Sequence, residues 1–201
     1  FNSNDPIGAE DKPYDPKKIP PIRRFKFISP GYFRTVGTPL VTGRDITWSD
    51  VLDDHPVAVI SENMAREMWG APSAALGKRI KVAPVDSWQE IVGVVGDVRD
   101  NGVHEPAPTI VYWPTMMAKF WGNERFASRS LTFVLRSDRT GTEAFLTQIR
   151  QAVWSVNGSL PLALVRTLQD VYDRSLARTT FAPAPGFLEG LRALADEDGF
   201  V

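Results

Sequence analysis

The sequence predicts an α+β fold with mixed or antiparallel sheets, packed helices and two subdomains. Roughly seven short strand-like runs and four or five amphipathic helical segments follow one another in mixed order. Two of the strand-like runs surround a short turn, as the strands of a hairpin do. With 201 residues, of which 43% are hydrophobic, the chain is long enough to bury a core.

The beginning of the chain is predicted to contain a loop, a strand and a short helix. Five prolines among residues 1–21 favour an extended loop, because proline lacks a backbone donor. Aromatic and basic side chains alternate over residues 22–29, which is typical of a strand. Ser29 then suits the N-cap of a helix over residues 30–36.

Residues 39–70 are predicted to contain the first buried strand. A short strand and turn over residues 39–47 lead into an acidic stretch, residues 48–56, which is predicted to be a loop or a single helical turn. The continuous apolar run VAVIS at residues 57–61 predicts a buried strand. Its last residue, Ser61, is expected to cap a helix over residues 62–70.

Two β-rich runs around a turn predict a hairpin. They cover residues 76–82 and residues 88–99. Gly93 and Gly96 lie inside the second run, where glycine marks a bulge or the close approach of another backbone. A further strand is expected at residues 110–114, which end in proline.

The last part of the core is predicted to alternate strands with helices. A connection bearing methionine and aromatic residues covers residues 115–129. Residues 130–137 alternate apolar and polar side chains as a strand does, and residues 142–156 carry an apolar helical face. A strand over residues 162–167 and a helix over residues 167–178 complete the predicted core.

Three segments follow from these elements. Residues 1–21 are a proline-rich loop segment, residues 22–178 the core domain, and residues 179–201 a linker with a short amphipathic helix. The helix is suggested by the spacing of its apolar residues, which include Leu188 and Leu191.

The composition argues against several classes of protein. The 23 Lys and Arg residues against 24 Asp and Glu residues give a net charge of −1, which offers no general attraction for nucleic acid. The absence of cysteine excludes disulfides, thiolate catalysis and cysteine zinc sites. No apolar run approaches the ~20 residues of a membrane span, so none is expected in this chain.

No catalytic, cofactor-binding or metal site is predicted. His55 and His104 lie in predicted loops, without a nucleophile in a recognisable motif. The carboxylates around Asp50 and those of Asp97 and Asp100 lack the spacing of a calcium loop, so solvated acidic loops are expected. The glycines match neither nucleotide-binding pattern, and no cofactor is expected.

One segment is a candidate partner contact. Methionine and aromatic side chains together are common at protein interfaces, and the stretch WPTMMAKFW holds several. The alternative is that these side chains pack within the loop. The candidate residues are Trp113, Met116, Met117, Phe120 and Trp121.

The order of several motifs resembles that of a known family. ISPGYFRTVGTPLVTGRDIT is followed by PVAVISENMAREMWG, ALGKRIKV, WQEIVGVVGDVRDNGVHEPAPTIVYWP, LTFVLRS and IRQAVWSVNGSLPLALVRTLQDVYDRSLAR. This series, over about residues 25–178, resembles the MacB-like periplasmic core domain of bacterial ABC transporter permeases of the FtsX/MacB type. It looks most like the second such domain of the large duplicated permeases.

The resemblance implies a non-catalytic domain on the extracytoplasmic, periplasmic face of a bacterial inner membrane. It implies as partners the transmembrane helices of the parent permease, a cytoplasmic ATPase and a periplasmic partner protein. The domain would couple ATP-driven movement of the membrane helices to a partner or substrate outside, as in family members that drive efflux. The alternative is a small-ligand or substrate-binding module with its site between two subdomains. A hydrolase is disfavoured, because no nucleophile and base are visible together.

Two features depart from the family pattern. The segment RSLAR normally leads into an apolar membrane segment, whereas here a proline-rich stretch follows it. The family domain also normally opens with an amphipathic helix and a strand before the proline-rich loop. One hypothesis is that the helix in residues 179–201 takes the place of that opening helix; the other is an altered terminus.

Overall fold

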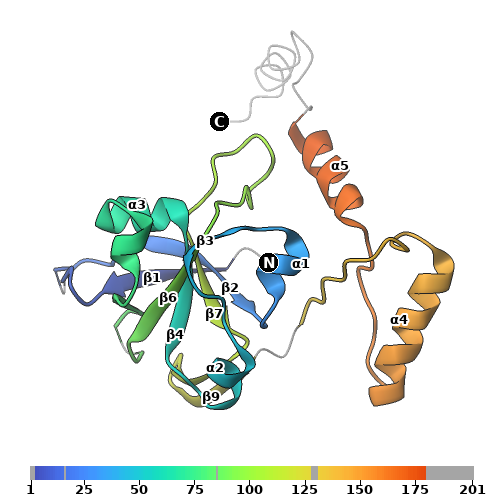
Figure 1. Cartoon of the computed structure of the whole chain (residues 1–201), viewed down its shortest axis with the longest axis horizontal. Coiled ribbons are helices and arrows are strands. Elements are labelled where there is room, and N and C mark those ends of the chain that lie inside the picture. Colours follow the sequence, from blue (N-terminus) through green and yellow to red (C-terminus); the bar gives the residue numbers. More distant parts are fainter. Residues whose placement is uncertain (1–2, 16, 85, 128–130, 180–201) are drawn as a thin grey trace, which may run out of the picture. The chain divides into compact units, whose positions relative to one another are not determined.

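The computed structural model describes residues 3–15, 17–84, 86–127 and 131–179, and it confirms the α+β fold class (Figure 1). The chain divides into two compact units. Unit 1 comprises residues 1–101 and 105–138, and unit 2 comprises residues 102–104 and 139–201.

Unit 1 is built on a seven-stranded mixed sheet in the order β3-β6-β4-β7-β2-β1-β5. Because β5 also pairs with β6, six of the strands close into a barrel-like ring and β3 lies outside it. Antiparallel pairs predominate, and β2–β7 and β4–β6 are parallel. The strands are β1 Ser3–Ala9, β2 Ile22–Ile28, β3 Leu40–Gly43, β4 Val57–Ser61, β5 Arg79–Val82, β6 Gln89–Val95 and β7 Ile110–Pro114.

Strand β1 corrects the prediction that residues 1–21 form only a loop. It pairs antiparallel with β2 and, through Ile7 opposite Val82, with β5. Pro6 is tolerated within it because its carbonyl still accepts a hydrogen bond from Ala83. The prolines alone therefore misled the prediction, since β1 depends on partner strands distant in sequence.

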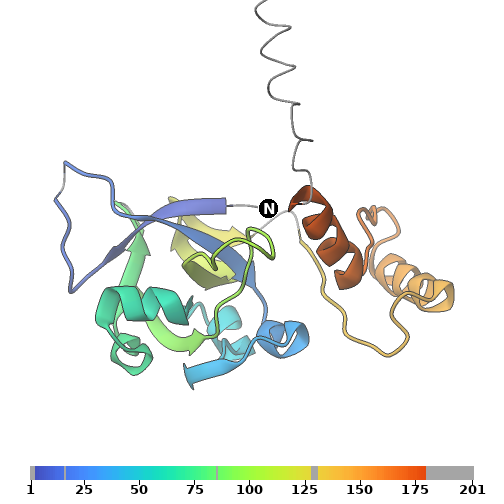
Figure 2. The same ribbon diagram turned by 90° about the horizontal axis from the view of Figure 1, so that it is seen from above.

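Three α-helices and one short 3₁₀ helix accompany the sheet. They are α1 Tyr32–Val36, α2 Trp48–Leu52, α3 Glu62–Trp69 and η1 Pro72–Ala75. Helix α2 has a capping box, in which Thr47 and Asp50 satisfy each other's backbone N–H groups. Helix α3 packs against β4 and β6 (Figure 2).

One predicted helix cap is wrong, and the other, Ser61, is the N-cap residue of α3 but makes no cap bond with its side chain. Helix α1 begins after Gly31 and not after Ser29. Ser61 makes no cap hydrogen bond; its hydroxyl instead accepts the backbone N–H of Ile110 at 2.8 Å, which ties β4 to β7. Both serines have the right chemistry for a cap, but the hydroxyl of Ser61 is used between strands instead.

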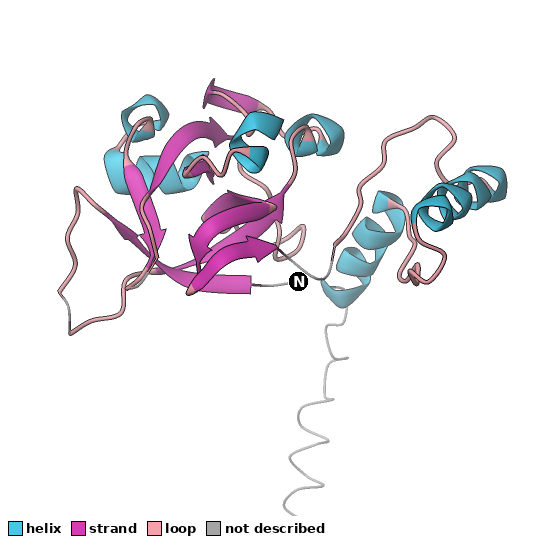
Figure 3. Ribbon diagram, turned by 90° about the horizontal axis from the view of Figure 1, so that it is seen from below, coloured by secondary structure: helices cyan, strands magenta, loops and turns pink. Residues whose placement is uncertain are grey.

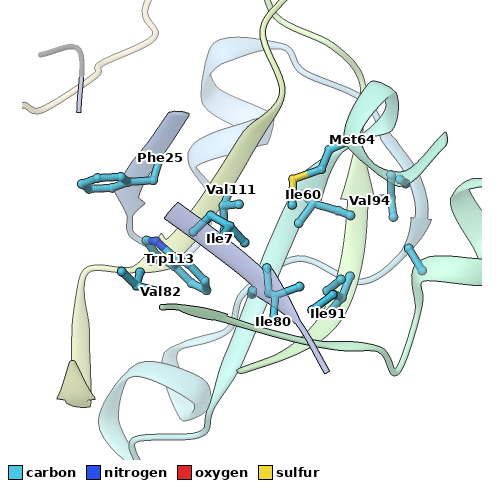
Figure 4. Packing of buried hydrophobic residues seen from close by; sticks show 14 of the residues in the cluster. Ile7, Phe25, Ile60, Met64, Ile80, Val82, Ile91, Val94, Val111 and Trp113 are labelled. Atoms are coloured by element: carbon cyan, nitrogen blue, oxygen red, sulfur yellow. The ribbon is translucent and has the colours of Figure 1, made fainter. Parts of the chain in front are cut away.

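The core of unit 1 lies around the central strands. All five residues of β4 and all five of β7 are buried, as continuous apolar runs predict. Figure 4 shows side chains from β1, β5, β6 and α3 meeting those of β4 and β7. The labelled members of this cluster are Ile7, Phe25, Ile60, Met64, Ile80, Val82, Ile91, Val94, Val111 and Trp113.

Glycines allow β3 and β6 to approach each other closely, as predicted for Gly93. A Cβ atom added to Gly93 would come within 3.0 Å of the Arg44 carbonyl oxygen. The pairing of β6 with β4 also shifts in register at this point. Gly96 is more open, since its added Cβ would lie 3.0 Å from the ring of Pro39.

A second hairpin was not predicted. Strands β8 Met116–Phe120 and β9 Asn123–Ala127 form a separate two-stranded sheet within what was expected to be an irregular connection. Lys119 and Trp121 adopt left-handed backbone conformations at φ 50° and 49°. Non-glycine residues rarely adopt this conformation, so the local sequence gave little signal for the turn.

Unit 2 consists of helices and connecting segments in its described part (Figure 3). Helix α4, Glu143–Val156, is capped by Thr142, and helix α5, Leu168–Thr179, begins where Thr167 and Asp170 bond each other. Both predicted helices are therefore confirmed. Among residues 139–177 no side chain is buried, so the apolar faces of these helices lie open.

Two predicted strands are absent. The described residues 131–137 and residues 162–167 are not strands, although the first segment alternates apolar and polar side chains and the second begins with four apolar residues. A strand needs a neighbour to satisfy its backbone groups, and no described segment pairs with either one. The hypothesis on residues 180–201 lies outside the described residues.

No helix in the described ranges combines the length and apolar character that crossing a bilayer requires.

Candidate functional site

The tip of the β8–β9 hairpin is held by two carboxylates from elsewhere in unit 1. The backbone N–H of Trp121 donates to Asp86 Oδ1 at 2.9 Å. Its indole N–H donates to Asp5 Oδ2 at 3.0 Å. Asp5 lies on β1 and Asp86 lies between β5 and β6. One tryptophan therefore joins three segments that are distant in sequence.

Both carboxylates lie in surroundings that favour the protonated form. Asp86 is 6% exposed, and its Oδ2 atom has no hydrogen-bond partner. Burial raises the pKa of Asp86, although the backbone N–H groups of Trp121 and Gly122 oppose this. Burial also raises the pKa of Asp5 against the effect of its bond from Trp121, and the charge of Asp86 raises it further.

An aromatic cluster lies under the hairpin tip. The centroid of the Trp121 ring is 5.4 Å from that of Phe25 and 5.6 Å from that of Phe27, both nearly perpendicular to it. The rings of Phe120 and Phe126 each lie 5.1 Å from it. Such edge-to-face contacts stabilise the docked hairpin beyond the burial of apolar area.

An open hollow of about 290 Å³ lies beside this tip. Its lining residues are polar or charged apart from one glycine, whereas hydrophobic and aromatic residues predominate in a typical small-molecule pocket. The lining residues are Asp86, Ser87, Lys119, Gly122, Asn123 and Glu124.

The predicted partner-contact residues lie together but are mostly core. Trp113 and Phe120 are fully buried, and Met117 is 4% exposed. Met116 is half-buried, and Trp121 is 40% exposed. Three of the five therefore cannot meet a partner while the hairpin is docked, because the barrel and the hairpin cover them. Trp121 is the member that presents a large apolar surface.

The acidic stretch before β4 is only partly solvated, because Asp50 is buried whereas Asp53 is exposed. Asp50 is 2% exposed and accepts two hydrogen bonds from the Arg44 guanidinium, at 2.6 and 2.9 Å. It also accepts the backbone N–H of Thr47 at 2.7 Å. Burial would raise its pKa, but the bonds from Arg44 and Thr47 lower it well below the usual range. Asp50 is therefore a structural anchor of α2.

Asp100 has a similar structural role in the loop after β6. Its carboxylate accepts hydrogen bonds from Arg24 at 2.7 Å and from Lys26 at 2.6 Å, both on β2. Burial opposes ionisation, yet these two cations lower the pKa of Asp100. Asp97 accepts the backbone N–H of Asn63 at 2.9 Å, near the start of α3. Both carboxylates brace loops; Asp100 is half-buried, whereas Asp97 is exposed.

The described residues bring together no recognisable catalytic or metal-binding set. His55 Nδ1 lies 3.5 Å from Asp50, whose carboxylate is already occupied by Arg44, and His104 is exposed in its loop. No group of three or more potential metal-ligating side chains occurs among them. The sequence reasoning missed Asp5 and Asp86, because each lies in a segment read as an ordinary loop or turn.

Comparison with known proteins places this fold in a family. The family model of the MacB-like periplasmic core domain matches residues 14–152. The periplasmic region of MacB from Actinobacillus actinomycetemcomitans is 19% identical, with a TM-score of 0.51 over 78% of this chain and 64% of that one. The chain thus spans less than two thirds of that region's length. No curated protein matches the sequence.

A second solved structure is less similar. The extracellular domain of the noncanonic ABC-type transporter YknZ from Gram-positive bacteria is 20% identical, with a TM-score of 0.37 over 55% of this chain and 53% of that one.

The family match covers more than half of the chain, and it includes the barrel strands from β2 onward, the hairpin and most of α4. This chain therefore belongs to the family of MacB-like periplasmic core domains, which is a family of extracytoplasmic transporter domains and not of enzymes.

Proposed function

We propose that the domain couples ATP-driven movement of the parent permease to a partner protein outside the membrane. The observation that carries the proposal is the exposed Trp121 at the tip of a hairpin docked on the barrel. Tryptophan is among the residues that contribute most to protein interfaces. A partner that binds the tip would thereby be attached to unit 1.

The ionic groups of unit 1 support a mechanical role. Asp50 and Asp100 are both engaged by basic side chains, and Arg23 binds Glu67 through two hydrogen bonds at 2.8 and 2.6 Å. Such pairs brace loops and helices against the sheet. They make unit 1 a body that can transmit displacement, which a coupling domain needs.

The small-ligand alternative has weaker support. Ligand pockets usually enclose about 300–1,000 Å³ with apolar walls. The hollow beside the hairpin tip reaches only about 290 Å³, is open and has a polar lining. Docking of a partner therefore accounts for the exposed tryptophan better than capture of a small molecule does.

Coupling is tested by distance measurements in the parent permease. The chain contains no cysteine, so spin labels can be placed at Glu124→Cys in unit 1 and Gln151→Cys in unit 2, both exposed positions. We expect the distance distribution between the labels to change when ATP binds. An identical distribution with and without ATP would overturn coupling through this domain.

Docking is tested separately with two tryptophan variants. Trp121→Ala removes the proposed contact, and Trp48→Ala removes a tryptophan that is 57% exposed on α2. ATP hydrolysis by the parent transporter is measured in native membranes, where its partners are present. We expect Trp121→Ala to change the rate several-fold and Trp48→Ala to leave it unchanged. Equal effects of the two variants would refute docking at the hairpin tip.

A further inference from the structure

We propose that Asp5 and Asp86 form a proton-dependent clamp on Trp121. The clamp is tight when at least one of the two carboxyls holds a proton and loosens when both are ionised. Both groups bond the same residue, one at its backbone and one at its indole ring. Opening the clamp would release the tip of the β8–β9 hairpin.

The unpaired oxygen of Asp86 is where the proton would bind. Oδ1 accepts the backbone N–H of Trp121, whereas Oδ2 is buried and has no partner. Protonation at Oδ2 would remove the buried charge and leave the bond at Oδ1 intact. A buried ionised carboxylate with an unsatisfied oxygen is unfavourable, so loss of that charge stabilises the docked tip.

The backbone at the tip depends on such restraint. Lys119 and Trp121 have φ angles of 50° and 49°, in the left-handed region that non-glycine residues rarely adopt. Gly122, at φ 71°, takes the same region without difficulty. Two of the three residues 119–121 are therefore non-glycine residues in a left-handed conformation. Because this conformation is unfavourable for them, tertiary contacts must hold the docked turn. The two carboxylates supply part of that restraint.

The charges around the clamp do not remove the repulsion between its carboxylates. Lys81 on β5 lowers the pKa of Asp86, but its Nζ already donates to the Pro84 carbonyl at 3.0 Å and lies over the Trp88 ring. Arg23, opposite Asp5 in the sheet, is bound to Glu67.

The remaining charged neighbours are exposed. Lys119 and Glu124 line the hollow beside Asp86, with opposite charges. Their fields are weakened by solvent. Neither one supplies Asp86 with a buried cation.

The direction of the pH response follows from these surroundings. The pKa of Asp86 and that of Asp5 are both raised in the folded chain above their ordinary value of 3.8. Their contribution to docking is therefore complete at low pH and is lost as pH rises through the raised values. The tip is held most firmly in acid and loosens toward neutral pH.

The consequence for docking rests on the proposed function. A loosened tip would present more of Trp121, and of the rings of Phe25 and Phe27 beneath it, to a partner. The medium outside the inner membrane would then set how readily the partner binds. The clamp itself requires no partner, so it can be tested on this chain alone.

The experiment follows the indole N–H resonance of Trp121 in the ¹⁵N-labelled full chain from pH 4 to pH 8. The resonance is assigned by its loss in Trp121→Phe. In the unsubstituted chain we expect it to titrate with a midpoint above 3.8, the ordinary value for aspartate. In Asp86→Asn, whose neutral amide mimics the protonated acid, we expect the low-pH position to persist up to pH 8.

Two further variants complete the test. Asp5→Asn should also reduce the pH-dependent shift of the Trp121 resonance. If Asp86→Asn fails to fold, the result with Asp5→Asn decides whether the clamp exists. Asp53→Asn, at an exposed carboxylate on the C-terminal side of α2, should leave the titration unchanged.

Three results would overturn the clamp. One is a Trp121 resonance that stays constant across the pH range, and another is an unaltered titration in both clamp variants. The third is a shift caused by calcium chloride at fixed pH and abolished in Asp86→Asn, because Oδ2 would then bind a cation instead of a proton. Since no partner is present, each result leaves the docking proposal to its own test.

Discussion

Substitution of Gly93 by alanine should strongly destabilise unit 1. The added methyl group would lie within 3.0 Å of the Arg44 carbonyl oxygen, a distance that real Cβ atoms do not reach. The obstacle is backbone, so β3 and β6 would have to separate where Gly43 pairs with Gly93. Overpacking in a core typically costs about 1–3 kcal/mol, and a backbone obstacle places the expected loss at the top of that range, about 3 kcal/mol.

Two other glycines provide graded controls. At Gly96 the added Cβ would lie 3.0 Å from the Pro39 ring, for an expected loss of about 1 kcal/mol. At Gly8 it would lie 3.1 Å from the edge of Tyr14, a side chain that can turn away, so the loss should stay below about 1 kcal/mol.

The free energy of unfolding is measured by urea titration followed by tryptophan fluorescence. Five of the six tryptophans belong to unit 1, so the signal reports mainly on that unit. The expected order of destabilisation is Gly93→Ala, then Gly96→Ala, then Gly8→Ala. If Gly93→Ala were no more destabilising than Gly8→Ala, the close approach of β3 and β6 would be refuted.

Two buried carboxylates give further predictions. Asp50→Ala should lower the free energy of unfolding by about 2–3 kcal/mol, because it removes a capping box and the partner of Arg44. The control Asp53→Ala, at an exposed site, should change it by less than about 0.5 kcal/mol. Equal losses for the two variants in urea titrations would contradict this prediction. Asp100→Asn should cost about 2–4 kcal/mol at pH 7, since it leaves Arg24 buried without its partner. The pKa of Asp100 is lowered, so its contribution is present above the ordinary value of 3.8 and lost as pH falls toward the folded value. The difference between the two chains should therefore shrink in acid, and a constant difference would refute the assignment.

Local patterns were sufficient for the central elements. The apolar run of β4 predicted a buried strand, and residues 110–114 were predicted to be a strand; β4 and β7 are both fully buried. Helices were predicted over residues 142–156, from the spacing of apolar residues, and over residues 167–178, and α4 and α5 occur there. In each case the sequence pattern that predicted the element lies within the element itself.

The candidate site could not be predicted in the same way. Trp121 was singled out by composition, together with Trp113 and Phe120, which prove to be core. Asp5 and Asp86 were not singled out, because 80 residues lie between them and no local pattern indicates that both bond the same residue. Only the pairing of β1 with β5 and the docking of the hairpin bring them to one indole ring and one backbone N–H.

The sequence by itself determined the fold class, the family resemblance and the buried central strands, because hydrophobic periodicity and motif order are local properties of the chain. The tertiary structure alone decided that residues 3–9 form a strand and that residues 131–137 and 162–167 do not. A strand exists only where another backbone satisfies its hydrogen-bonding groups, and Asp5 and Asp86 bond Trp121 only because the distant hairpin tip docks there. Both conditions depend on contacts between segments far apart in sequence, which local patterns do not contain.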